Sequence, residues 1–162
     1  MQYFLAGGFE LSQDTKWLGK GMYFWDNLSN AKFWRKEKIR KGDPPHIEAC
    51  KIVTAKISCK DFFDFTDDDE RESFERLWLV AKSQLSSSQI SRMGFGQILD
   101  YVFEFYTDLK QCPVVKVHAD YSTTQKNTVL FDNTQFVRTV KTIYSVRKDS
   151  AISCRKEMLE DE

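Results

Sequence analysis

Residues 17–34, with the sequence WLGKGMYFWDNLSNAKFW, constrain the fold more strongly than any other stretch of the chain. Gly19 and Gly21 come just before three aromatic residues in a row, and this pattern predicts a short strand over residues 19–25, reached through a glycine turn. Three polar residues that can cap a helix follow: Asp26, Asn27 and Ser29. We therefore expect a strand followed closely by a helix, with the backbone at Gly21 able to approach a flat group.

The expected helix has an apolar side and a basic side. Apolar residues recur at helical spacing on the first side: Leu28, Ala31, Trp34 and Ile39. Cations occupy the other side: Lys32, Arg35, Lys36, Lys38, Arg40 and Lys41. The sequence Gly42-Asp43-Pro44-Pro45 ends the helix, because proline lacks a backbone N–H and clashes with the preceding turn. A basic helix from Lys32 to Lys41 with interleaved aromatic rings is one pattern of nucleic-acid binding, although most such faces are only solvated.

The rest of the chain predicts a mixed α+β fold, with helices early and a mainly antiparallel sheet late. Helices are expected before Gly7-Gly8, around residues 74–85 and over residues 95–109, with the polar stretch SQLSSSQIS between the last two. Strands are expected within residues 46–58, 114–119, 128–131 and 139–146. We interpret the acidic run Asp64 to Glu72 as a solvated turn with favourable charge at a helix start, and not as a metal site. We expect one domain over residues 1–152 and a charged, frayed tail over residues 153–162.

The composition narrows the class of protein. The 162 residues include 24 Lys plus Arg and 24 Asp plus Glu, so no net charge draws the chain to nucleic acid or to a membrane surface. The four cysteines form no CxxC pair and have no metal-ligand spacing, so we expect reduced thiols in a cytoplasmic protein. No apolar run approaches the roughly 20 residues that a membrane-spanning helix needs.

The sequence Gly19-Lys20-Gly21-Met22-Tyr23-Phe24 resembles the Gly-Lys-Gly-Ile-Tyr-Phe strand of the poly(ADP-ribose) polymerase branch of ADP-ribosyltransferases. Residues 19–34 are more similar still to a bacterial group of this fold, which has a Gly-x-Gly-x-Tyr-Phe-Trp strand and an Ala-x-x-Trp helix. A weaker likeness in spacing continues through PPHIEACKI, DFFDFTD and VRKDSAI. The resemblance covers most of the chain, but only its first block is specific.

The resemblance implies an α+β fold with a split antiparallel sheet and flanking helices, and it implies NAD as a substrate with no metal. In the family, the tyrosine packs on nicotinamide, an aromatic residue eleven positions later closes the other face, and a small residue contacts the carboxamide. These positions correspond to Tyr23, Trp34 and Ala31. The cofactor contacts implied by the likeness are Gly19, Gly21, Tyr23, Phe24, Ala31 and Trp34. The alternative interpretation is that these rings are ordinary core residues.

Two expected parts of the family pattern have no counterpart here. The family begins with a strand bearing His-Gly, which should precede the helix that ends at Gly7-Gly8, so we expect this first strand to be missing and its coding sequence to lie upstream of Met1. His46 and His118 come too late in the chain to replace that histidine, and we expect each to be an ordinary surface or strand residue. The family's catalytic carboxylate, or glutamine in the bacterial group, aligns with Ile143; a second register places Gln135 there.

The leading functional hypothesis is NAD-dependent mono-ADP-ribosyl transfer, a glycosyltransferase reaction, in a bacterial toxin or phage-defence factor. Tyr23 and Gln135 are then the catalytic candidates, with Ile143 as the alternative position. A second hypothesis is a catalytically inactive domain that binds NAD, ADP-ribose or a protein partner. A third is a nucleic-acid-binding module that uses the helix from Lys32 to Lys41. The acceptor, whether protein or nucleic acid, does not follow from the sequence.

Overall fold

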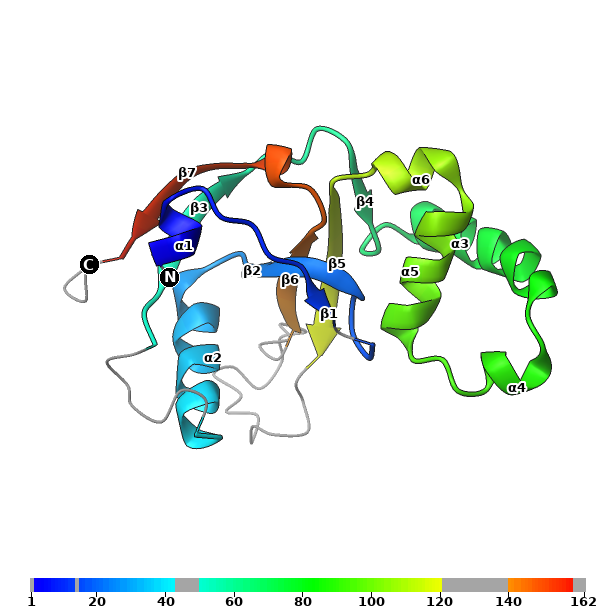
Figure 1. The fold of residues 1–162 in the computed structure, drawn as a ribbon, viewed down its shortest axis with the longest axis horizontal. Coiled ribbons are helices and arrows are strands. Elements are labelled where there is room, and N and C mark those ends of the chain that lie inside the picture. The colour runs from blue at the N-terminus through cyan, green and yellow to red at the C-terminus, as the bar shows by residue number, and fades with distance from the viewer. Residues whose placement is uncertain (1, 14, 43–49, 121–139, 159–162) are drawn as a thin grey trace, which may run out of the picture.

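The computed structural model describes residues 2–13, 15–42, 50–120 and 140–158 (Figure 1). Its helices and strands follow one another in this order: α1 (Gln2–Leu5), β1 (Ser12–Gln13), β2 (Lys20–Trp25), α2 (Leu28–Arg40), β3 (Val53–Ile57), β4 (Phe62–Asp64), α3 (Asp68–Ala81), the 3-10 turn η2 (Lys82–Gln84), α4 (Ser87–Ile90), α5 (Phe95–Phe105), α6 (Thr107–Gln111), β5 (Val114–Asp120), β6 (Val140–Val146), the 3-10 turn η4 (Asp149–Ala151) and β7 (Ile152–Glu157). The fold is mixed α+β, as the sequence predicts.

The strands form two separate sheets. The larger sheet has five strands in the order β1-β2-β6-β5-β4, and the smaller one pairs β3 with β7. All pairs are antiparallel except that of β4 with β5. Figure 1 shows α3, α4, α5 and α6 gathered at one end of the larger sheet, beside β4 and β5. The smaller sheet, α1 and α2 lie toward the other end, near β2.

Two groups of buried side chains hold the sheets and helices together. The first lies between the larger sheet and the helices α3 and α5, and these residues at its centre are buried: Leu99, Val102, Phe103, Val115 and Ile143. The second lies on the side of the smaller sheet and is built on Val114, Val146 and Ala151. Because side chains alternate along a strand, β2 contributes to both groups. Tyr23 and Trp25 pack against the first, whereas Phe24 packs against the second.

The strand and helix predicted from residues 17–34 are both confirmed. Gly19 has a φ of +66°, a conformation that glycine adopts without strain, and β2 begins at the next residue. Asn27 caps α2, because its side-chain oxygen accepts a hydrogen bond from the backbone N–H of Asn30 at 2.9 Å. The helix ends at Arg40, and Gly42 follows it with a φ of +73°.

Other predictions were wrong or incomplete. The single helix expected over residues 95–109 is two helices, since Tyr106 between α5 and α6 is extended. The expected polar break contains α4, which is started by a capping box of Ser86 and Gln89. The tail expected from residue 153 contains most of β7. The strand expected within residues 46–58 is limited to β3, while residues 46–49 and the strand expected at 128–131 lie outside the described residues.

Candidate ligand pocket

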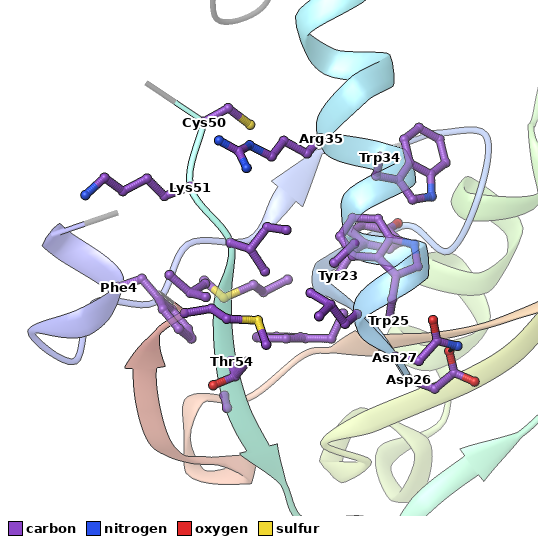
Figure 2. A pocket seen from close by; sticks show the side chains of 18 of the residues that line it. Phe4, Tyr23, Trp25, Asp26, Asn27, Trp34, Arg35, Cys50, Lys51 and Thr54 are labelled. Carbon is purple, nitrogen blue, oxygen red and sulfur yellow. Dashed lines mark hydrogen bonds between the residues drawn. The ribbon is translucent and has the colours of Figure 1, made fainter. Parts of the chain in front are cut away.

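A pocket of about 480 Å³ lies between β2, α2 and the segment that leads into β3 (Figure 2). This volume is within the range of pockets that hold small organic ligands. Four of the six residues that the sequence predicts as cofactor contacts line it: Tyr23, Phe24, Ala31 and Trp34. The opposite wall comes from residues 50–55, and Phe4 of α1 and Met158 also line the pocket. The predicted residues of β2 and α2 are therefore brought together at one pocket.

The helix α2 turns one face toward this pocket. Ala31, Trp34, Arg35 and Lys38 all line it, and their spacing of three and four residues places them on one face of a helix. The start of α2 is fixed by Asn30, which is only 6% exposed. The Asn30 amide donates to Asp26 Oδ1 at 3.0 Å and its oxygen accepts a hydrogen bond from Lys141 Nζ at 2.7 Å. These bonds link α2 to Asp26, the residue that follows β2, and to Lys141 of β6.

Two aromatic residues of the pocket, Trp34 and Tyr23, are held by contacts with other residues of the protein. Trp34 stacks on Trp25, with ring centroids 5.8 Å apart and an angle of 28° between the planes, and Figure 2 shows the two indoles together. Tyr23 is fixed at its hydroxyl, which donates to the Gly19 carbonyl at 2.7 Å and accepts from the Leu18 N–H at 3.2 Å. Because Trp25 already occupies one face of Trp34, the nicotinamide sandwich of Tyr23 and Trp34 stays a prediction.

Gly19 and Gly21, the two predicted cofactor contacts that do not line the pocket, are packed against other residues of the protein. A Cβ added to Gly19 would lie 2.4 Å from Asp100 Oδ1, and one added to Gly21 would lie 1.9 Å from Ser145 Oγ. Asp100 belongs to α5 and Ser145 to β6. The close approach that the sequence predicts at Gly21 is therefore an approach between neighbouring strands.

Three of the four charged side chains that line the pocket are cations. Arg35 and Lys38 line it from α2, and Lys51 lines it from the opposite wall, where it pairs with Glu157 at 2.5 Å. Arg35 extends toward the wall formed by Cys50 and Lys51 (Figure 2). Asp26 also lines the pocket, but its Oδ1 accepts hydrogen bonds from the amides of Asn27 and Asn30. This balance of charge favours a ligand with anionic groups.

The two positions proposed for a catalytic side chain do not supply one in the described structure. Ile143 is 4% exposed and belongs to the first buried group, and in the register of the sheet it lies opposite Trp25 of β2. Gln135 lies outside the described residues. His118 is an exposed residue of β5, as predicted, and His46 lies outside the described residues.

Sequence reasoning missed Phe4, Lys51 and Met158 as lining residues. They come from three distant segments that meet because β3 pairs with β7 and α1 contacts β7. Arg155 of β7 holds the N-terminal segment in place, since its guanidinium donates hydrogen bonds to the carbonyls of Phe4 and Gly8. The alternating burial of residues 53–57 is visible in the sequence, but the pairing that places them at the pocket is not.

An ion pair lies on the larger sheet outside the pocket. Lys116 Nζ of β5 is 2.8 Å from Asp64 Oδ2 of β4 and 3.2 Å from Thr66 Oγ1. Burial by itself would raise the pKa of Asp64, but the hydrogen bonds from Lys116 and Thr66 outweigh it and lower that pKa.

The acidic run that follows caps α3 through Asp67, as predicted. The described residues contain no group of side chains suited to hold a metal ion.

The chain matches no family model, no curated protein and no solved structure. Within the parts of the chain that the structure describes, no helix has the length and apolar character needed to cross a membrane. All four cysteines are free thiols, as predicted.

Proposed function

We propose that the chain binds NAD, or a related ligand containing ADP-ribose, in the pocket between β2, α2 and β3. The observation that carries the proposal is that Tyr23, Phe24, Ala31 and Trp34, which the sequence likeness selects, line the same pocket. The separation of β3 and β7 from the larger sheet is compatible with the split sheet of ADP-ribosyltransferases. On this proposal the chain is a diverged protein of that type.

The chemistry of the pocket suits the parts of such a ligand. Nicotinamide and adenine are flat, and Trp34 and Phe24 offer aromatic surface against which a flat ring can pack. The methyl group of Ala31 leaves room at the start of α2 for a carboxamide. A diphosphate carries negative charge, and three cations line the pocket: Arg35, Lys38 and Lys51, the last paired with Glu157.

We propose binding as the primary activity, with mono-ADP-ribosyl transfer as the activity of the fold type. Transfer passes through a sugar centre that carries positive charge, and a carboxylate that orients the ribose hydroxyls stabilises it. Ile143 offers no such group, and it points into the first buried group of side chains. This favours a binding domain over a fast enzyme, in a role such as a toxin or phage-defence factor.

Isothermal titration calorimetry with NAD tests the proposal. Replacing Trp34 with Ala should weaken binding several-fold, because loss of one stacked ring costs about 0.5–1.5 kcal/mol beyond its buried area. Lys38→Gln should also weaken binding, whereas Lys36→Gln should not, since Lys36 lies on the same helix but does not line the pocket. Phe105→Ala removes an exposed ring of α5 as a control. Absence of NAD and ADP-ribose binding by the unmodified chain would refute the proposal.

A second candidate function is nucleic-acid binding by α2. The observation that favours it is that the cations of α2 are divided between two faces. Lys32, Lys36 and Arg40 are spaced four residues apart and exposed to solvent, and none of them lines the pocket. This stripe is available to a phosphate backbone even when the pocket holds a ligand.

A further inference from the structure

We infer that Asp100 is a positioning residue of the pocket, because it holds closed the turn at Gly19 that in turn fixes the ring of Tyr23. The inference rests on the proposed function only in treating Tyr23 as a ligand contact. Asp100 itself lies on α5 and does not line the pocket. It would act on the ligand through the turn.

The first link joins Asp100 to the turn. The backbone N–H of Lys20 donates to both carboxylate oxygens of Asp100, with N–O distances of 3.0 Å each. Lys20 is the first residue of β2, so this bond fixes the point at which the strand begins. A carboxylate is suited to this position because both of its oxygens accept hydrogen bonds.

The second link is the contact between Asp100 and Gly19. Gly19 has a φ of +66°, and a Cβ at this position would lie 2.4 Å from Asp100 Oδ1 and 2.5 Å from its Cγ. Any larger residue would push the carboxylate away from the turn. The glycine is therefore required both by the backbone conformation and by the closeness of Asp100.

The third link joins the turn to Tyr23. The Tyr23 hydroxyl donates to the Gly19 carbonyl at 2.7 Å and accepts from the Leu18 N–H at 3.2 Å. Residues 18–20 are thus held by Asp100 through one N–H and by Tyr23 through another N–H and a carbonyl. A displacement of the turn would remove both of these hydrogen bonds of the phenol hydroxyl and so change the surroundings of the ring.

Arg147 fixes the orientation of the Asp100 carboxylate. Its Nη2 donates to Asp100 Oδ1, and the two side chains are only 12% and 19% exposed. The guanidinium lies over the ring of Phe103, with 4.7 Å between Cζ and the ring centroid, and the backbone N–H of Arg147 donates to Pro113 at 2.7 Å. Because the Lys20 N–H and Arg147 Nη2, which bond to this carboxylate, are both donors, an amide at position 100 would place its NH₂ against a donor.

Asp100→Asn therefore tests the inference without changing side-chain size. Glu104→Gln is the matched control, since Glu104 lies one turn further along α5 and pairs with exposed Lys110. The first readout is ¹⁹F NMR of the chain labelled with 3-fluorotyrosine, in which the Tyr23 signal is identified by its absence in Tyr23→Phe. We expect Asp100→Asn to shift or broaden this signal and Glu104→Gln to leave it unchanged. This readout needs no ligand.

The second readout is the affinity for NAD in a double-mutant cycle. Asp100→Asn should weaken binding several-fold in the natural chain but by less than about twofold in the Tyr23→Phe background, where the link to the hydroxyl is already absent. An unchanged Tyr23 signal, or effects that multiply in the double variant, would overturn the inference. If the natural chain does not bind NAD, the proposed function fails while the NMR result still decides the role of Asp100. If Asp100→Asn does not fold, Gly19→Ala displaces the same turn and should give the same change.

Discussion

Gly21 of β2 and Ser145 of β6 make a close contact that leaves no space for a larger side chain, although the register of the sheet places Ser145 opposite Tyr23. A Cβ on Gly21 would lie 1.9 Å from Ser145 Oγ and 3.2 Å from Ser145 Cβ. Ser145 is completely buried, and its hydroxyl has no hydrogen-bond partner among the described residues. Burying such a group without a partner costs free energy, so the serine does not stabilise the sheet through its oxygen.

This contact gives a prediction for stability. Gly21→Ala should lower the free energy of unfolding by about 1–3 kcal/mol, because it overpacks the space between the strands. Ser145→Ala should be neutral or slightly stabilising, since it removes the unpaired oxygen. Combined with Gly21→Ala it should recover a large part of the loss, because the remaining Cβ–Cβ contact of 3.2 Å is tight but tolerable. Urea unfolding of the three variants measures this, and a double variant no more stable than Gly21→Ala would contradict it.

At the level of single residues, the sequence predicts where the backbone is unusual but not which group makes it so. The spacing of Gly19 and Gly21 indicates a turn, which occurs, and a backbone that approaches a flat group at Gly21, where the structure instead has a close contact with Ser145. The approaching groups, Asp100 and Ser145, belong to elements far along the chain. Nothing in their local sequence marks them as neighbours of these glycines. Ile143 is similar, because its alignment with a catalytic position does not reveal that it packs into the core.

The helix α2 has one face that lines the pocket and another that is exposed to solvent. Ala31, Trp34, Arg35 and Lys38 form the face that lines the pocket. Lys32, Lys36 and Arg40 form an exposed stripe on another face, in which Arg40 pairs with Glu37 at 2.8 Å. A ligand in the pocket and a partner on the stripe would therefore depend on different cations of the same helix.

Salt dependence separates these two uses of α2. If the stripe binds a phosphate backbone, anisotropy with a fluorescent dT oligonucleotide should show affinity falling steeply between roughly 50 and 200 mM salt. Lys32→Gln with Lys36→Gln should reduce the log–log slope by about 0.7 for each lost contact on a single strand, while NAD affinity is unchanged. Lys38→Gln should show the opposite pattern. No binding at low salt, or an unaltered slope, would leave the stripe as a solvated face.

The elements that the sequence predicts least well are those decided by tertiary contacts. The apolar pattern of residues 95–109 fits one helix, but Tyr106 is extended and its hydroxyl donates to the carbonyl of Leu77 in α3 at 3.1 Å. Three of the six residues of β7 are charged, and the segment resembles a tail. They form a strand because β3 offers an edge, with pairs such as Thr54 opposite Lys156. Local propensity cannot reveal either contact.

For the whole molecule, the sequence predicts the α+β class and most of the elements, but it does not predict the arrangement of the strands. The order β1-β2-β6-β5-β4 places β6, the last strand of the larger sheet, between β2 and β5, and it leaves β3 and β7 to pair separately. That separation creates the pocket, since β2 and α2 form one wall and residues 50–55 another. Half of the pocket is thus encoded in one continuous motif, and the other half depends on long-range pairing.

The arrangement of the sheet also determines what catalysis is available to the described part of the chain. On β6, Ile143 lies between Trp25 of β2 and Val117 of β5 and faces the first buried group. A carboxylate placed there would meet apolar side chains, with Leu99 and Val102 fully buried in the same group. Its charge would be desolvated among these side chains, so it would disfavour folding before it could assist transfer.

We therefore predict that the chain releases nicotinamide from NAD slowly or not at all, and that Ile143→Glu does not raise this rate. The variant should lose about 3–5 kcal/mol of stability, as expected for a buried charge without a partner. Ile143→Val is the matched control and should cost about 0.5–1.5 kcal/mol, since it removes one methyl group. The measurement is nicotinamide release from labelled NAD, with label counted separately in protein and RNA, beside urea unfolding of each variant. Rapid release by the unmodified chain would show that the catalytic group lies elsewhere, and Gln135, outside the described residues, would then be the first residue to replace.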